Sequence, residues 1–177
     1  LDPNLITCFG WSSLLKKELL GIPELGVLGF HPAELPKNRG RHPIIWSLVL
    51  GLNRTASTFF FMGEGADDGD IVSQEGIEIK ARDDSSTLYK KMTKVAENQL
   101  PKIIKQLKTG TNTLIPQDHS KANIWRKRTE KDGEIDWRMG AESIHNLVRA
   151  LAKPYPGAHF IFKKEKYKVW KTKINKN

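Results

Sequence analysis

The chain has 177 residues, 38% hydrophobic and 28% charged, proportions that are typical of a folded globular protein and exclude a largely disordered one. The net charge of +9 would suit a nucleic-acid partner, but the lysines concentrate at 90–108 and 163–176, where we favour a solvated helix face and hairpin. A single cysteine, Cys8, excludes an internal disulfide and a cysteine-based metal site, and no apolar run reaches the ~18 residues that span a bilayer. We therefore expect a cytoplasmic protein with no bound metal and no membrane contact.

The predicted elements alternate between strands and helices. Short apolar runs next to glycine or proline indicate strands, and amphipathic stretches that follow serine, aspartate or proline indicate helices. Ser12 is expected to cap the first helix, and Pro101 is expected to kink the longest one. The expected strands are 5–10, 26–30, 55–62, 71–79, 159–162 and 167–174, and the expected helices are 13–20, 43–50, 84–108 and 141–152.

Composition divides the chain into three parts. An α/β core is expected at 1–110, a connector at 111–140, and a small helix and β-hairpin subdomain at 141–177; the composition shifts to Gly, Thr, Asn, Pro and Gln at 109–118, where the connector begins. The chain starts at Leu1 and enters a strand almost at once. We therefore expect the early strands of the fold to be absent from this chain.

A histidine and an aspartate follow two predicted strands. His31 leaves the strand at 26–30, and Asp67 lies in the acidic, glycine-rich loop after the strand at 55–62. In open α/β sheets, ligands bind where loops leave the carboxyl ends of strands, and a histidine with a carboxylate can share a proton-transfer task near neutral pH. The same residues also fit two structural roles, a turn histidine and an aspartate that caps backbone amides.

Several motifs resemble those of the folate-dependent formyltransferases. The order and spacing agree for His31-Pro-Ala-Glu-Leu-Pro-Lys-Asn-Arg-Gly-Arg-His-Pro and for the segment 66–71. Segments 131–137, 144–150 and 154–158 are similar to motifs that methionyl-tRNA formyltransferases share with nucleotide-sugar N-formyltransferases. The resemblance implies a Rossmann-like formyltransferase fold, with a partial sheet, flanking helices and the C-terminal helix and hairpin.

The resemblance also implies a reaction and its catalytic residues. A primary amine would attack the formyl carbon of N10-formyltetrahydrofolate, the co-substrate, through a tetrahedral intermediate. His31 would donate a proton to the oxyanion, and Asp67 would manage proton transfer and orient the imidazole. The positions that match the family's folate site are Ser13, Leu14, Leu15, Arg41, Gly63, Glu64, Gly65, Ala66 and Asp67.

One position departs from the family pattern. The family normally has a catalytic asparagine two residues before the histidine, where this chain has Gly29. The oxyanion site is then expected to be one donor short. Asn38 lies in the same loop and could substitute, but a turn position explains it at least as well, so we leave it out of the catalytic set.

The sequence allows more than one class of formyl acceptor. We favour a UDP- or dTDP-linked amino sugar destined for a surface polysaccharide, because the aromatic and basic segment 122–129 resembles the nucleotide-sugar enzymes and little chain follows Trp137. The net charge of +9 supports the alternative, a methionyl-tRNA formyltransferase fragment that binds tRNA. A third reading is a non-catalytic folate-binding module, because of Gly29. Homodimerisation through the C-terminal hairpin is a further expectation.

Overall fold

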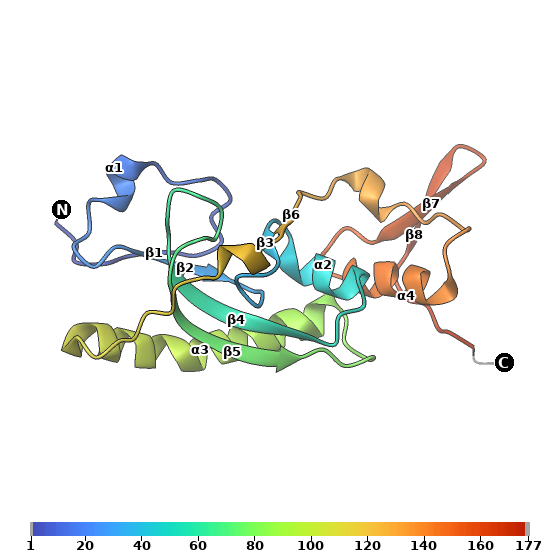
Figure 1. Ribbon diagram of the computed structural model, residues 1–177. Helices are drawn as coiled ribbons and strands as arrows, with labels where there is room; N and C mark the ends of the chain where they lie inside the picture. The colour runs from blue at the N-terminus through green and yellow to red at the C-terminus, as the bar shows by residue number, and fades with distance from the viewer. Residues whose placement is uncertain (1, 176–177) are drawn as a thin grey trace.

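A four-stranded mixed sheet forms the left and central part of the molecule in Figure 1. The computed structural model describes residues 2–175, and its strand order is β1-β2-β4-β5. β1 (Ile6–Cys8) runs parallel to β2 (Val27–His31), whereas β4 (Arg54–Phe61) and β5 (Ile71–Glu78) are each antiparallel to their neighbour. The predicted α/β fold is confirmed.

The long helix α3 (Ser85–Thr109) packs against β4 and β5. Its start is fixed locally, because the Asp84 carboxylate accepts a hydrogen bond from the backbone N–H of Thr87 in a capping box. It ends at Gly110, which has a φ of 64° and adopts the left-handed conformation that favours glycine. Ile103 and Leu107 from the helix pack with the sheet residues Leu28, Phe59 and Val72.

A second, larger core joins the two halves of the chain. α2 (Pro43–Val49) packs against α4 (Ala141–Ala150), and their buried residues form one cluster with the end of β5 and the start of α3. The hairpin of β7 (Ala158–Phe162) and β8 (Glu165–Val169) follows α4. The expected C-terminal helix and hairpin are therefore present, and they share their core with the sheet domain.

The connector contains short elements that contact the loop after β2. It includes the 3-10 helices η1 (His119–Lys121) and η2 (Glu130–Gly133) and the strand β6 (Ile124–Trp125). β6 pairs in parallel with β3 (Arg39–Gly40). The loop that was expected to lack regular structure therefore contains a short strand.

Two predicted boundaries are wrong. The first helix, α1, spans only Lys17–Leu20, and Ser12 does not cap it; because none of its residues is buried, no apolar face stabilises a longer helix. β8 begins and ends earlier than predicted, because Lys163 and Lys164 form the hairpin turn with φ values of 48° and 69°.

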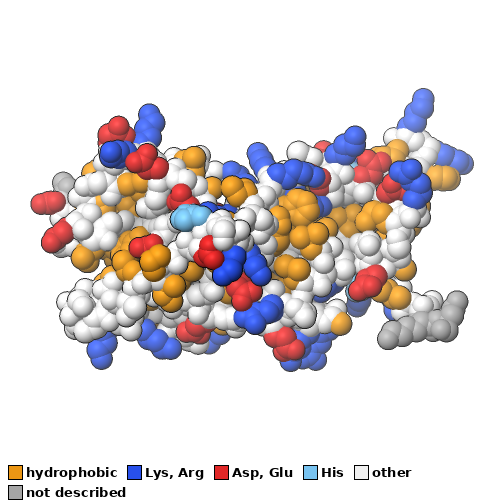
Figure 2. Space-filling model, in the orientation of Figure 1, with side chains coloured by type: hydrophobic (Ala, Val, Ile, Leu, Met, Phe, Trp, Pro, Cys, Tyr) orange, Lys and Arg blue, Asp and Glu red, His pale blue; other side chains and the backbone are white. Residues whose placement is uncertain are grey.

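Basic and acidic side chains are interspersed over the face drawn in Figure 2. Lys91, Lys102, Lys121, Arg126 and Lys166 each have a carboxylate partner within salt-bridge distance. No helix within residues 2–175 has the length and apolar character needed to cross a membrane.

Candidate active site

His31 and Asp67 lie close together, but the direction of their strands does not explain this proximity. β2 and β4 are antiparallel, so their carboxyl ends point in opposite directions, and His31 pairs with Thr58 in the middle of β4. The expectation that both residues leave adjacent strand ends at one edge is therefore wrong. The long loop after β4 folds back over β2 and brings Asp67 to the histidine.

The histidine and the carboxylate form a hydrogen-bonded cluster with the backbone of the β2–β3 loop. His31 Nδ1 lies 3.4 Å from Asp67 Oδ2, and His31 Nε2 donates to the carbonyl of Asn38 at 2.7 Å. Asp67 Oδ2 also accepts from the backbone N–H of Gly40 at 2.8 Å. Because both imidazole nitrogens face acceptor oxygens, a doubly protonated ring would satisfy both contacts.

The two groups differ in access to solvent. The His31 side chain is 5% exposed and that of Asp67 is 20% exposed. Asp67 has a φ of 53°, a strained conformation for a residue other than glycine, and such strain accumulates at functional sites. Asn38 has a φ of 64°, a left-handed conformation that asparagine tolerates in turns, and its backbone N–H donates to Asn123 Oδ1 at 2.9 Å.

β3 connects the segments that were matched to the folate site. Gly40 contacts Asp67, and the next residue, Arg41, donates from Nη1 to the carbonyl of Ser12 at 2.6 Å. Ser13 and Leu14 are exposed and Leu15 is half-buried in the irregular segment before α1, which leaves backbone groups free to bind a ligand.

The acidic loop is closely packed around one carboxylate. A Cβ at Gly65 would lie 2.1 Å from Asp68 Oδ2, and one at Gly63 would lie 2.7 Å from Asp68 Oδ1. A side chain at either position would displace the Asp68 carboxylate from where it lies here. Asp68 Oδ1 is buried, and it has no hydrogen-bond partner in residues 2–175. Gly63, Gly65 and Ala66 are half-buried and Glu64 is exposed.

A buried network that the sequence did not reveal holds this loop. Gln117 Nε2 donates to the carbonyls of Asp67 at 2.9 Å and Gly69 at 2.6 Å. Its Oε1 accepts from Arg39 Nη2 at 2.6 Å, and Arg39 Nη2 lies 3.2 Å from His119 Nδ1. Gln117 and Arg39 are each 6% exposed. Only the tertiary contact between β3 and the connector brings these residues together.

Side chains from β4 and from the residue just after it occupy the space beside Gly29. A Cβ there would lie 2.8 Å from Met62 Cγ and 3.0 Å from Phe60 Cε1. Apolar side chains thus occupy the space that an asparagine would need. No group of three His, Cys, Asp or Glu side chains in the described part of the chain is placed to hold a metal ion.

Several solved structures share this fold. A 4-N formyltransferase from Francisella tularensis superposes with a TM-score of 0.84 at 24% identity, over 98% of this chain and 72% of that one. Methionyl-tRNA formyltransferase from Clostridium thermocellum gives 0.80 at 22% identity, over 98% and 74%. WlaRD, a sugar 3N-formyl transferase solved in the presence of dTDP and 5-N-formyl-THF, gives 0.77 at 19% identity, over 94% and 60%.

The sequence matches two family models, one over its N-terminal part and one over its C-terminal part. Residues 127–177 match "Formyl transferase, C-terminal domain", which covers α4 and the hairpin. Residues 1–104 match "Formyl transferase", which covers the sheet, both loops of the candidate site and most of α3. With this match over more than half of its length, the chain belongs to the formyl transferase family.

Proposed function

We propose that this protein transfers a formyl group from N10-formyltetrahydrofolate to the primary amine of a UDP- or dTDP-linked amino sugar. The observation that carries the proposal is the contact of His31 with Asp67, held by Gly40, beside the segments matched to the folate site. This cluster places a proton donor and a proton acceptor within reach of one another in a formyl transferase chain.

His31 is the group that stabilises negative charge. The N–H at His31 Nε2 donates a hydrogen bond to the Asn38 carbonyl in this structure. During the reaction this proton would move to the formyl oxygen as negative charge develops on that oxygen. Asp67 keeps the imidazole oriented and accepts the proton that the amine loses, directly or through water. As the bond between the folate nitrogen N10 and the formyl carbon breaks, that proton passes to N10, and the formyl oxygen returns its own proton to His31. The Gly40 N–H fixes the carboxylate oxygen for that task.

The residues present fit a reduced folate. When bound, the folate supplies the electrophilic formyl carbon. The N–H groups of its pterin ring would complement the unpartnered Asp68 Oδ1 and the backbone carbonyls of the loop 63–67. Arg41 and the segment 13–15 would bind on the other side of β3, which agrees with the contact of Arg41 with Ser12. Both sets of folate contacts depend on the observed positions of the loop 63–67 and the segment 13–15.

A nucleotide-linked amino sugar is the favoured acceptor. The support is the shared fold with WlaRD, a sugar enzyme solved with dTDP, and the mixture of basic and acidic side chains on the face drawn in Figure 2. The product would enter a surface polysaccharide. We also retain the division into a catalytic core at 1–110, a connector at 111–140 and a subdomain at 141–177, the cytoplasmic location, and dimerisation through the hairpin as parts of this proposal.

The second candidate function is formylation of Met-tRNA. The observations that favour it are the net charge of +9 and the shared fold with the tRNA enzyme. The two acceptors differ in what they need from the protein, since tRNA binding depends on neutralised phosphates and weakens steeply with salt.

The test is formyl transfer from N10-formyltetrahydrofolate to dTDP- and UDP-amino sugars and to Met-tRNA, followed for this chain, its His31→Ala and Asp67→Asn variants, and an N-terminally extended protein. We expect turnover of a nucleotide sugar and a fall in kcat of roughly 100-fold or more in either variant. His145→Ala and Asp84→Asn are the matched controls and should keep wild-type activity. Transfer to none of the acceptors by any of the proteins would reject the proposal.

A further inference from the structure

Three polar side chains form a row across one face of the sheet. His31 of β2 pairs with Thr58 of β4, and Thr58 pairs with Gln74 of β5. Residues that lie directly opposite one another in neighbouring strands point to the same face of a sheet. The row therefore leads from the buried His31 to an exposed residue of the strand at the edge of the sheet, Gln74.

Hydrogen bonds connect part of this row to the backbone of the loop after β2. The amide nitrogen of Gln74 donates to Thr58 Oγ1 and to the carbonyl of Leu35, each at 3.0 Å. Thr58 Oγ1 in turn donates to the carbonyl of Ala33 at 2.6 Å. The amide has two protons and the hydroxyl has one, so the donors and acceptors match in number. The bonds therefore run in one direction, from Gln74 through Thr58 to the loop.

The two carbonyls belong to the loop that carries the hydrogen-bond acceptor of His31. The loop continues from Leu35 to Asn38, whose carbonyl accepts from His31 Nε2. The backbone N–H of Ala33 also donates to the carbonyl of His31 at 2.9 Å, and that of Leu35 donates to the carbonyl of Ala33 at 3.1 Å. The start of the loop is therefore fixed on the sheet, and only residues 36–37 separate it from Asn38.

Apolar packing alone would not orient this loop. The side chain of Leu35 is buried with Phe60 and Ile71, which keeps the loop close to the sheet. Apolar contacts are non-directional, whereas a hydrogen bond restricts the direction in which a carbonyl points. At the other end of the loop, Asn123 of the connector accepts from the backbone N–H of Asn38. The hydrogen bonds from β4 and β5 thus orient one end of the loop, and the connector orients the other.

We propose that Thr58 and Gln74 are positioning residues for formyl transfer, because they hold the β2–β3 loop where the Asn38 carbonyl meets His31 Nε2. Within residues 2–175 neither side chain hydrogen-bonds to His31 itself, so both act through the loop. A shifted carbonyl would release the imidazole, and a small displacement of a reacting group lowers the rate strongly. The inference rests on the proposed function for its effect on the rate, whereas the effect on the imidazole is measured without turnover.

The first test follows the N–H at His31 Nε2 by nitrogen-15 NMR of the full chain, with His31→Ala to assign the signal. In the wild type we expect slow exchange of this proton with water, because it is buried and hydrogen-bonded. Gln74→Met and Thr58→Val each remove donors to the loop without shortening the side chain. Each should speed the exchange by about tenfold or more. Gln74 is exposed, so its variant tests the proposal if Thr58→Val unfolds.

A neighbouring hydroxyl separates positioning from a general loss of stability. Ser57 is as buried as Thr58, but it points to the other face of the sheet and donates to Gln99 of α3. Ser57→Ala should therefore lower the stability, as measured by chemical denaturation, and leave the exchange at His31 unchanged.

The second test is the rate of formyl transfer. In Gln74→Met and Thr58→Val, kcat should fall about fivefold or more. The KM values for folate and acceptor should remain nearly unchanged, because neither residue belongs to the segments matched to the folate site. Thr58→Ser retains the hydroxyl and should restore the wild-type kcat. Gln106→Met, at an exposed position of α3, is the control for Gln74→Met.

The assignment would be wrong if the exchange at His31 stayed unchanged in both variants, if Ser57→Ala accelerated it equally, or if both variants kept the wild-type kcat. A protein that shows the expected exchange but formylates no acceptor would contradict the proposed function and leave the effect of Thr58 and Gln74 on His31 standing. An active wild type whose two variants are equally active would do the reverse.

Discussion

The backbone of Asp67 is held by a side chain from a distant part of the chain. Gln117 donates to the carbonyls of Asp67 and Gly69 and accepts from Arg39, all in a buried setting. The loop that carries the carboxylate is otherwise rich in glycine, which alone would leave it many conformations. Gln117 therefore acts as a positioning residue for Asp67 and not as a catalytic one.

Gln117→Ala should destabilise the protein by about 3 kcal/mol, because it removes four hydrogen bonds and takes from the buried Arg39 guanidinium the amide oxygen that accepts two of them. Chemical denaturation measures this loss, and kcat should fall while the KM for the acceptor changes little. Gln106→Ala, at an exposed position of α3, is the control. Equal unfolding free energies for the two variants would contradict the positioning role.

The side chains of Met62 and Phe60 leave no room for a Cβ at Gly29. Gly29→Asn should therefore lower the unfolding free energy by roughly 1–3 kcal/mol. Adding Met62→Ala should recover part of the loss, a coupling that a double-mutant cycle measures. Gly140→Asn is the matched control, since a Cβ there meets open space and asparagine is a good N-cap for α4. Additive effects of Gly29→Asn and Met62→Ala would argue against the clash.

The sequence predicts site residues that stand next to one another in a motif, and it misses those that are far apart along the chain. His31, Arg41 and the loop 63–67 stand in two contiguous motifs, so the sequence alone identified them as candidates. Gln117 lies fifty positions from Asp67, and no periodicity links the two. The filling of the Gly29 position depends on the register of β2 against β4, which sequence patterns do not determine.

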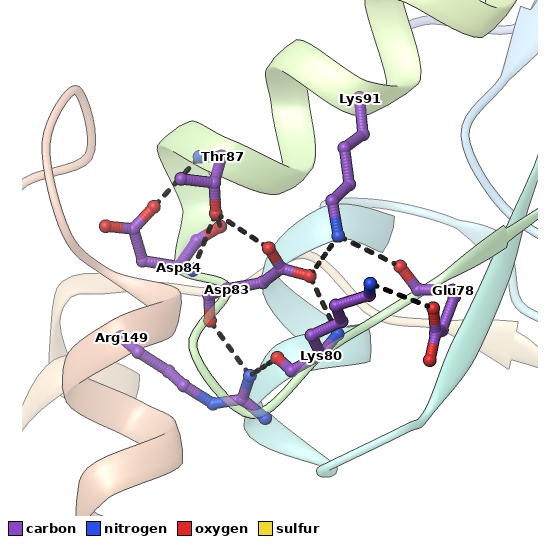
Figure 3. A network of polar contacts seen from close by, with 7 residues as sticks. All are labelled: Glu78, Lys80, Asp83, Asp84, Thr87, Lys91 and Arg149. Atoms are coloured by element: carbon purple, nitrogen blue, oxygen red, sulfur yellow. Dashed lines mark hydrogen bonds and ion pairs between the residues drawn. The ribbon is translucent and has the colours of Figure 1, made fainter.

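At the scale of elements, the turn between β5 and α3 ties α3 to α4. The Asp83 carboxylate accepts from the backbone of Lys80 at 2.7 Å, from Thr87 at 3.3 Å and from the ammonium of Lys91, as Figure 3 shows. Arg149 of α4 donates to the Asp83 carbonyl at 2.9 Å. One buried residue thus connects the start of α3 to the C-terminal half.

Asp83→Asn should lower stability at neutral pH by about 1–2 kcal/mol and reduce its acid sensitivity. Burial alone would raise the pKa of Asp83, but hydrogen bonds from Lys91, Lys80 and Thr87 outweigh it and lower the pKa below 3.8. A lowered carboxyl pKa stabilises the fold above the unfolded-state value, and this stabilisation disappears as pH falls through the folded-state value. The check is unfolding free energy against pH from 7 to 2.

The control for this prediction is the adjacent residue. Asp84→Asn should leave stability nearly unchanged, because asparagine caps helices as well as aspartate does. If Asp83→Asn and Asp84→Asn show the same pH profile as the wild type, the Asp83 network does not contribute to acid sensitivity.

Local signals predicted α3 well and α1 poorly, for one physical reason. The capping box at Asp84 and the left-handed Gly110 lie within the sequence of α3 itself, and its apolar face meets a sheet. The segment 13–20 contains four leucines, but no residue of α1 is buried, so most of the predicted helix is absent. Tertiary burial, which the sequence pattern does not contain, made the difference.

At the scale of the whole molecule, the two halves share one core. Leu48 of α2, Leu88 of α3 and Leu147 of α4 belong to the same buried cluster, although they come from the sheet domain and the C-terminal part. The composition predicts a connector and a small C-terminal subdomain, and one buried core joins that C-terminal part to the sheet domain.

The net charge of +9 yields the last prediction, on tRNA. Carboxylate partners lie within salt-bridge distance of Lys91, Lys102, Lys121, Arg126 and Lys166, and acidic side chains lie between the basic ones on the face drawn in Figure 2. A surface of this kind attracts polyanions only weakly, so tRNA should bind no tighter than the ~10⁻⁴ to 10⁻⁶ M of non-specific association at physiological salt. Filter binding of initiator Met-tRNA between 50 and 200 mM salt, with non-cognate tRNA as the control, measures this. Saturable binding with a preference for the initiator and a loss of about 10³-fold over that range would instead favour the tRNA acceptor, because it requires a cluster of phosphate contacts.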